Sequence, residues 1–239
     1  MLRVLSYNIR HGEGMDGQID LGRIAEVIGR QGPDLVALQE VDKGCKRTDG
    51  RDIAAELGAL LNIEHRFARF MPYQGGDYGV AVLSRLPVVG TSVHRIPGRV
   101  DEYCVLEVRV QVDGVATPVS FVSLHNDYRD ESTRVSQVEA IHEALGNVER
   151  PVILAGDFNA ERTGPSLQYL ADHGWEFLDK TGNSKTYPAD DPKVEIDFFA
   201  IRGVSTVSFE HEVVDERVAS DHKPISAAIT YKEMEENIR

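Results

Sequence analysis

Residues 151–160 read PVILAGDFNA, and this stretch guides the interpretation of the rest of the chain. The apolar run at its start is typical of a short strand, residues 151–155, that is buried on both faces. Gly156 comes next, and we expect it to let the chain leave the sheet in a conformation that other residues avoid. Asp157 and Asn159 follow at the carboxyl end of the strand, where open α/β sheets carry their binding sites. A polar turn is the alternative interpretation of these two residues.

The length and composition of the chain predict one folded unit. Its 239 residues are 41% hydrophobic, which is enough to bury one substantial core, and no stretch has the composition of a linker. We therefore expect a single domain over residues 1–239. The chain starts directly with a strand-like run, and no apolar run approaches about 18 residues. These features predict a cytoplasmic protein with neither a signal peptide nor a transmembrane segment.

The formal net charge of −13 bears on the kind of partner. Proteins that grip long nucleic acids usually present a basic surface, and this sequence contains no block of Lys and Arg. The charge favours a small phosphorylated substrate over duplex DNA, but a metal ion and a few arginines can supply a local positive field. Cys45 and Cys104 are the only cysteines, which fits a reducing compartment better than a disulfide scaffold.

Two strand–helix–strand units are predicted from the apolar periodicity. The first comprises strands at residues 2–9 and 34–38 with a helix at 20–30, and the second comprises strands at 119–124 and 151–155 with a helix at 131–145. Asp20 is the expected N-cap of the first helix. Polar residues follow each strand, so both units deliver polar groups to the carboxyl edge of a sheet.

The remaining elements complete a strand-rich α/β chain. We predict further helices at residues 52–61 and 165–173 and strands at residues 66–70, 80–84, 88–95, 102–112, 194–201, 206–213 and 225–231. Asp113 and Gly114 form an expected hairpin turn that leads into a strand from residue 115. Residues 183–192 are predicted to be a loop, and the charged residues 232–239 a frayed end.

Polar residues at five places have the chemistry of a metal-dependent site. They are Asn8, Glu40, His125, Asp127, Asp157, Asn159, Asp197, Asp221 and His222. Several carboxylates in one place repel one another unless a cation lies among them. Glu, Asp and Asn oxygens suit Mg²⁺ or Mn²⁺, and the other groups can orient a water molecule and stabilise a phosphoryl transition state. Each residue alone also has an ordinary structural role, such as a strand-end cap or a core histidine.

Six motifs in this sequence resemble those of the endonuclease/exonuclease/phosphatase superfamily. They are SYN at residues 6–8, LQEV at 38–41, GVAVLSRLP at 79–87, GDFN at 156–159, ID at 196–197 and SDH at 220–222. They occur in the family's order and span nearly the whole chain. The family includes DNase I-like nucleases, AP endonucleases, inositol polyphosphate 5-phosphatases and neutral sphingomyelinases.

The resemblance implies a fold and a set of residue roles. The implied fold is the DNase I-like four-layer α/β/β/α sandwich, with the site at one rim of its two sheets. The implied metal-binding residues are Glu40, Asn8 and Asp221. The implied catalytic residues are Asp157, which orients or deprotonates the attacking water, Asn159, His125 and His222, which contact the phosphate, and Asp197, which holds His222.

Weaker candidates lie near these motifs. Asp127 follows His125 in a family-like pattern, and Asp77 or Tyr78 precedes the GVAVLSR strand. For Arg134 a solvated helix face is the favoured interpretation, and for His65 and Arg66 it is a place on the surface.

The sequence thus predicts an enzyme, a Mg²⁺- or Mn²⁺-dependent hydrolase of phosphodiesters or phosphomonoesters. We favour a small phosphorylated compound or a lipid headgroup as its substrate. An endonuclease that acts on abasic or unspecific DNA is the alternative, and a non-catalytic binding protein with the same fold is a further one. The oligomeric state does not follow from the sequence.

Overall fold

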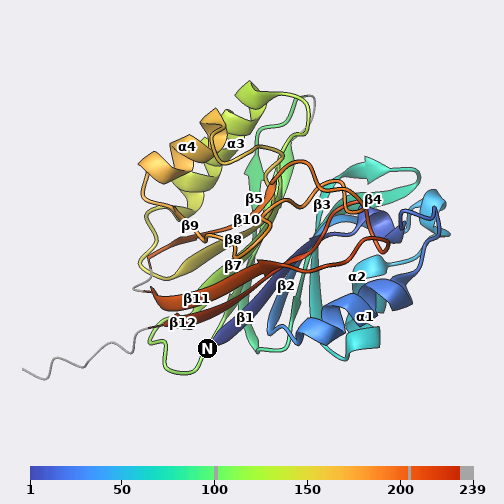
Figure 1. The fold of residues 1–239 in the computed structure, drawn as a ribbon, viewed down its shortest axis with the longest axis horizontal. Helices are drawn as coiled ribbons and strands as arrows, with labels where there is room; N and C mark the ends of the chain where they lie inside the picture. Colours follow the sequence, from blue (N-terminus) through green and yellow to red (C-terminus); the bar gives the residue numbers. More distant parts are fainter. Residues whose placement is uncertain (100–101, 204–205, 232–239) are drawn as a thin grey trace, which may run out of the picture.

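Two six-stranded sheets face each other, and a pair of helices covers the outer face of each sheet (Figure 1). The computed structural model describes residues 1–99, 102–203 and 206–231. The strand order is β11-β12-β1-β2-β4-β3 in the first sheet and β5-β6-β7-β8-β10-β9 in the second. Helices α1 and α2 pack on the first sheet, and α3 and α4 pack on the second. This arrangement is the expected four-layer α/β/β/α sandwich.

The elements follow the predicted order closely. The strands are β1 Leu2–Asn8, β2 Leu35–Lys43, β3 Glu64–Tyr73, β4 Gly76–Ser84, β5 Val88–Ile96, β6 Tyr103–Val110, β7 Val119–His125, β8 Val152–Asp157, β9 Glu176–Phe177, β10 Asp197–Arg202, β11 Thr206–Val213 and β12 Ile225–Tyr231. The helices are α1 Leu21–Gln31, α2 Ile53–Leu61, α3 Glu131–Leu145 and α4 Pro165–Asp172, with short 3₁₀ turns η1 Arg10–Gly12 and η2 Lys46–Thr48. Within the described ranges, no helix has both the length and the apolar character needed to cross a membrane.

The side chains of the central strands point alternately to the two faces of each sheet, and this alternation explains the layers of the sandwich. In β8, Ile153 faces the core between the two sheets, whereas Leu154 faces the core beneath α3 and α4. In β1, Val4 and Leu5 divide in the same way between the central core and the core beneath α1 and α2. Because successive strand residues point to opposite faces, a strand covered on both sides is apolar throughout.

Both predicted strand–helix–strand units are present. Strand β1 pairs in parallel with β2, and β7 pairs in parallel with β8, with α1 and α3 as the respective connections. Asp20 caps α1 as expected, because its side chain accepts a hydrogen bond from the backbone N–H of Arg23. Each unit therefore brings the carboxyl ends of its two strands to the same rim of the sandwich.

The prediction for Gly156 was wrong. Strand β8 continues through Gly156 to Asp157, and the backbone of Gly156 is not in a left-handed conformation. A Cβ atom at this position would lie 2.0 Å from the carbonyl oxygen of Leu124 on the neighbouring strand. Glycine is therefore required by the close approach of β7 and β8, and the left-handed conformation occurs instead at Asn159, with a φ of 51°.

Other differences concern element ends. The turn at Asp113 and Gly114 is present, but the strand after it begins at Val119. Strand β2 runs beyond the predicted end through Glu40, and the short strand β9 was not predicted. Residues 232–239, expected to fray, lie outside the described residues.

Candidate active site

The inner faces of four central strands end in polar residues at one rim of the sandwich. Strand β8 places Ile153, Ala155 and then Asp157 on its inner face, because every second residue points the same way. The same alternation places three more polar residues on inner faces at strand ends: Asn8 on β1, His125 on β7 and Asp197 on β10. The alternation that places apolar side chains in the core between the sheets therefore also places these polar side chains together at the rim.

Glu40 reaches this rim through an irregularity in β2. The register between β2 and β4 shifts between Leu38 and Val41, and Glu40 has a positive φ of 58°. Such bulges redirect side chains next to functional sites. The Asn8 Nδ2 group donates hydrogen bonds to Glu40 Oε1 at 3.3 Å and to Asp157 Oδ2 at 3.1 Å, so Asn8 joins the two sheets.

Asp157 is the point of convergence. Besides Asn8, His125 and His222 approach Asp157 Oδ2 with their Nε2 atoms, at 3.5 Å and 3.6 Å. Asp157 Oδ1 accepts a hydrogen bond from the backbone N–H of Asn159 at 2.8 Å. Burial raises the pKa of the Asp157 carboxyl, and the charge of Asp197, its direct partner across β8 and β10, raises it further.

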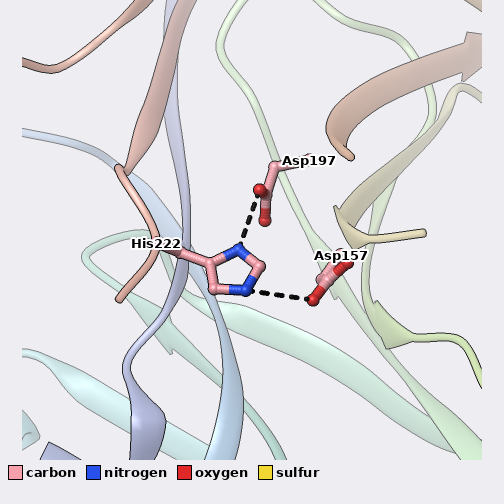
Figure 2. Close-up of side chains that lie close together, drawn as sticks. All are labelled: Asp157, Asp197 and His222. Carbon is pink, nitrogen blue, oxygen red and sulfur yellow. Dashed lines mark hydrogen bonds and ion pairs between the residues drawn. The ribbon is translucent and has the colours of Figure 1, made fainter. Parts of the chain in front are cut away.

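His222 lies between two carboxylates (Figure 2). Its Nδ1 atom is 3.0 Å from Asp197 Oδ2, and its Nε2 atom faces Asp157. Burial disfavours the imidazolium form, but the charges of Asp197 and Asp157 outweigh it and raise the pKa of His222 to about 10. The Nδ1 contact is a hydrogen bond, whereas the contact of Nε2 with Asp157 Oδ2, at 3.6 Å, is an ion pair only. Asp157, Asp197 and His222 each place one donor atom within 4.8 Å of the others, a grouping compact enough to hold a metal ion.

Asp221 belongs to the loop before β12. This loop is fixed because Ser220 Oγ donates a hydrogen bond to the carbonyl oxygen of Asn8 at 2.7 Å. Burial raises the pKa of the Asp221 carboxyl, and the charge of Glu40 raises it further. Two cationic neighbours oppose this rise in pKa: the adjacent His222, and Arg10, whose Nε atom is 3.8 Å from Oδ2. Glu40 and Asp221 are both partly exposed and have the oxygen donors that a hard divalent ion requires.

The two predicted amide residues are oriented by the backbone around them. The Asn8 amide oxygen accepts a hydrogen bond from the backbone N–H of Arg10, so the amide group here holds carboxylates in place, and its role as a metal ligand stays a prediction. Asn159 donates through Nδ2 to the carbonyl oxygen of Asn126 at 3.0 Å, which fixes it beside Asp157. Its contact with a phosphate also stays a prediction.

The weaker candidates divide between the site and the scaffold. Tyr78 lies near Glu40, whose charge adds to the effect of burial and raises its pKa. Asp77 forms an ion pair with Arg69 in the β3–β4 hairpin.

The remaining weaker candidates have partners in the scaffold. Asp127 accepts hydrogen bonds from Arg99 and from backbone N–H groups before α3, and Arg134 pairs with Glu131 on that helix. His65 and Arg66 are on β3, where Arg66 pairs with Glu64. Structural contacts therefore account for Asp77, Asp127 and Arg134.

Three contributors were not predicted. Arg10 lies two residues after Asn8, and this short spacing could have indicated that Arg10 is near the same rim. The Tyr187 ring lies 4.8 Å from the His222 ring, and the buried Lys180 Nζ donates to Glu195 and to the carbonyl oxygen of Asp197 at 2.8 Å. Both come from irregular segments, where no periodicity indicates which way a side chain points.

Solved structures with the same fold support this description. A conserved protein of unknown function from Enterococcus faecalis aligns with a TM-score of 0.81 and 20% identity over 97% of this chain and 100% of its own. A mannosyl-6-phosphatase from Bacteroides thetaiotaomicron aligns with a TM-score of 0.76 and 18% identity over 97% and 100%. Sphingomyelinase C from Streptomyces griseocarneus aligns with a TM-score of 0.68 and 20% identity over 95% and 98%. At these identities the likeness shows the fold alone.

Sequence comparison gives the family. No curated protein sequence matches the chain. Residues 5–222 match the model of the Endonuclease/Exonuclease/phosphatase family, whose members are generally phosphoester hydrolases that use divalent metals. Because this match covers nearly the whole chain, the protein belongs to the endonuclease/exonuclease/phosphatase family.

Proposed function

We propose that the protein is a hydrolase of phosphate esters that depends on a divalent metal ion, Mg²⁺ or Mn²⁺. One observation carries this proposal: three side chains from three separate segments, Asn8, His125 and His222, converge on a single oxygen of the buried Asp157. Burying an ionisable carboxyl costs free energy, and a buried carboxyl whose pKa is raised, in a cluster with other titratable groups, is typical of functional sites.

The acidic residues of the rim fit a divalent ion. Glu40 and Asp221 would hold it, with Asn8 beside them, because these groups supply oxygen ligands and the charge of Glu40 disfavours the ionised form of Asp221. When bound, the ion would polarise a phosphoryl oxygen and neutralise the charge that develops there.

The protein's own residues would position the reactants. Asp157 would accept a hydrogen bond from the attacking water and take its proton. The water oxygen forms a new bond to phosphorus, and the ester bond from phosphorus to the alcohol oxygen breaks. The leaving oxygen takes a proton from solvent water, and Asp157 returns its proton to the solvent. His222, held by Asp197, and His125 would donate hydrogen bonds to phosphoryl oxygens as negative charge grows on them.

We infer a small substrate rather than a nucleic acid. The net charge of −13 disfavours a long polyanion. Structural relatives include enzymes described as a mannosyl-6-phosphatase and a sphingomyelinase, which is compatible with a small or lipid-derived phosphate ester. Endonuclease activity and a purely binding function are the alternatives that the first experiment must separate.

Hydrolysis assays with and without metal test this proposal. We expect the purified protein to hydrolyse p-nitrophenyl phosphate or bis-p-nitrophenyl phosphate with Mg²⁺ or Mn²⁺ and to lose the activity in EDTA. Abasic duplex and supercoiled plasmid should be cleaved poorly by comparison. Glu40→Gln should lower turnover by about 100-fold or more, because it removes a carboxylate that we assign to the metal.

The matched control is Glu26→Gln on the exposed face of α1, where the glutamate side chain is 65% exposed and pairs with Arg30. This variant should keep full activity. Metal-independent turnover, or equal activity of the two variants, would contradict the proposal. Efficient plasmid nicking would instead assign the site to a nuclease.

A further inference from the structure

A buried lysine contacts the residue with which β10 begins. The side chain of Lys180 is fully buried, and its Nζ atom donates hydrogen bonds to Glu195 Oε1 at 2.6 Å and to the carbonyl oxygen of Asp197 at 2.8 Å. The same atom lies 4.3 Å from the centroid of the Phe198 ring. Because taking an ammonium group out of water is costly, a fully buried lysine is rare unless it is paired. The charge of Lys180 is therefore held between one acid and the backbone of Asp197.

The Lys180 ammonium takes the place of a strand partner that β10 lacks at this point. Strand β9 pairs with β10 only as far back as Ala200, and the backbone N–H of Leu178 donates to the carbonyl oxygen of Phe199. Every second carbonyl group of a strand points to the same side, so the carbonyl oxygen of Asp197 points to this side as well. A buried carbonyl group without a donor costs free energy, and Lys180 supplies the donor that β9 does not.

The side chain of Asp197 holds His222. Asp197 Oδ2 lies 3.0 Å from His222 Nδ1 (Figure 2), and within the described part of the chain the carboxylate forms no other hydrogen bond. A side chain with a single hydrogen bond depends on its backbone for its orientation, and second-shell contacts fix the geometry of the groups that meet a substrate. Whatever fixes the backbone of Asp197 therefore also fixes the imidazole of His222.

The charge of Lys180 acts at the same place. Burial lowers the pKa of Lys180, and the charges of Glu195 and Asp197 oppose this effect. The attraction between two charges is mutual, so Lys180 favours the ionised form of Asp197. Asp157, the partner of Asp197 across β8 and β10, is a like charge and disfavours that form. Lys180 thus offsets part of the repulsion between the two buried acids.

We propose that Lys180 is a positioning residue for the hydrolysis. It fixes the backbone of Asp197 and favours its negative charge, and it thereby holds His222 where the Nε2 atom can meet the phosphate. The inference rests on the proposed function and adds to it a residue that does not touch the substrate. Glu195 offers the matched comparison, because it pairs with Lys180 but forms no hydrogen bond with Asp197 or His222 among the described residues.

Two single variants separate positioning from stability. Lys180→Met removes the ammonium and keeps a long side chain, and we expect kcat for p-nitrophenyl phosphate to fall about 10- to 100-fold with little change in KM. Glu195→Gln removes the counter-charge and should lower stability, but it leaves the bond from Lys180 to Asp197 and should keep kcat. Lys180→Gln is the second variant if Lys180→Met does not fold. It keeps a donor without the charge and should lower kcat several-fold.

A double-mutant cycle tests whether the effect passes through the side chain of Asp197. In an Asp197→Ala background the carbonyl group is still present, but the carboxylate that holds His222 is gone. We expect the further change Lys180→Met to alter kcat by less than about 2-fold in this background. Losses that add fully in the double variant would overturn the inference, because Lys180 would then act independently of this carboxylate.

An imidazole signal gives a readout that does not depend on turnover. The Nδ1 proton of His222, held by Asp197, should give a downfield signal in ¹H–¹⁵N spectra, identified by its absence from His222→Gln. We expect Glu195→Gln to keep this signal and Lys180→Met to shift or broaden it. Arg150→Met is the control for stability, because it removes a cation from another buried acid, Glu107, and should change neither the signal nor kcat per folded molecule.

The outcomes separate this inference from the proposed function. If the wild type hydrolyses p-nitrophenyl phosphate with metal but Lys180→Met keeps its kcat, the inference is overturned and the proposed function stands. A fall in kcat with an unchanged His222 signal, or an equal fall in Glu195→Gln, would also overturn it. A wild-type protein without metal-dependent hydrolysis would overturn both.

Discussion

Two buried carboxylates in the second sheet have opposite surroundings. Glu107 on β6 and Asp157 on β8 are both 1% exposed. Glu107 is surrounded by positive or donating groups: Arg150 Nη2 at 2.8 Å, Arg109 Nη1 at 3.1 Å, His94 Nε2 at 2.9 Å and Ser120 Oγ at 2.6 Å. Burial alone would raise the pKa of Glu107, but these contacts outweigh it and hold the pKa well below its usual range.

The charge of Asp157 is compensated only in part. It faces a second acid, Asp197, and His222 lies between the two, with Nδ1 toward Asp197 and Nε2 toward Asp157. Its pKa is consequently raised. A buried carboxylate with several charged and hydrogen-bonding partners suits a structural role, whereas one with a raised pKa in a titratable cluster suits a chemical role. We therefore propose a structural role for Glu107 and a catalytic role for Asp157.

The variant Asp157→Asn tests the comparison with the largest expected effect. It keeps the shape of the side chain but removes the group that we assign to the attacking water. We expect kcat to fall by about 1,000-fold or more, while the melting temperature stays the same or rises because an unfavourable buried charge is removed. A variant that loses activity only because it unfolds would contradict this assignment.

The variant Glu107→Gln should show the reverse behaviour. Removing one partner of a buried charge cluster leaves Arg150 and Arg109 without their counter-charge, and we expect a loss of about 3 kcal/mol in the free energy of unfolding. Activity per folded molecule should not change. Denaturant unfolding and the hydrolysis assay measure the two quantities, and a Glu107→Gln protein as stable as the wild type would show that the cluster contributes no stability.

The pH dependence of stability sharpens the same contrast. Because the pKa of Glu107 is lowered by folding, its contribution is complete above the pKa of the unfolded chain, near 4.5, and is lost as the pH falls toward the folded value. The difference in unfolding free energy between wild type and Glu107→Gln should shrink by about 1.4 kcal/mol per pH unit below that point. Urea titrations at pH 7 and pH 3.5 test this, and a constant difference would contradict it.

The sequence predicted one side of this comparison and not the other. Asp157, Asn8 and His125 were recognisable because each ends an apolar strand, and strand alternation fixes the face on which they lie. Glu107 sits in the middle of a predicted strand. Its partners Arg150 and His94 lie 43 and 13 residues away, and no local pattern indicates such a pairing.

The fold shows a similar division. Helices, most strands and the two parallel units follow from periodicity, and the four-layer arrangement followed only from the family resemblance. The bulge that turns Glu40 toward the site depends on the pairing of β2 with β4, and the role of Gly156 depends on the carbonyl oxygen of Leu124 on the neighbouring strand. Arg47 is placed by contacts with Asp42 and two tyrosines that meet only in the folded chain. Tertiary contacts of this kind leave no periodic signal.

The central claim is that Glu40 and Asp221, the acids at the rim of the sandwich, bind a divalent metal ion. Titration calorimetry with Mn²⁺ tests it most directly, on the wild type, Glu40→Gln and Glu107→Gln. We predict saturable binding to the wild type and to Glu107→Gln, and binding weakened by about 100-fold in Glu40→Gln. Absence of binding to the wild type, or equal binding to all three proteins, would contradict the claim.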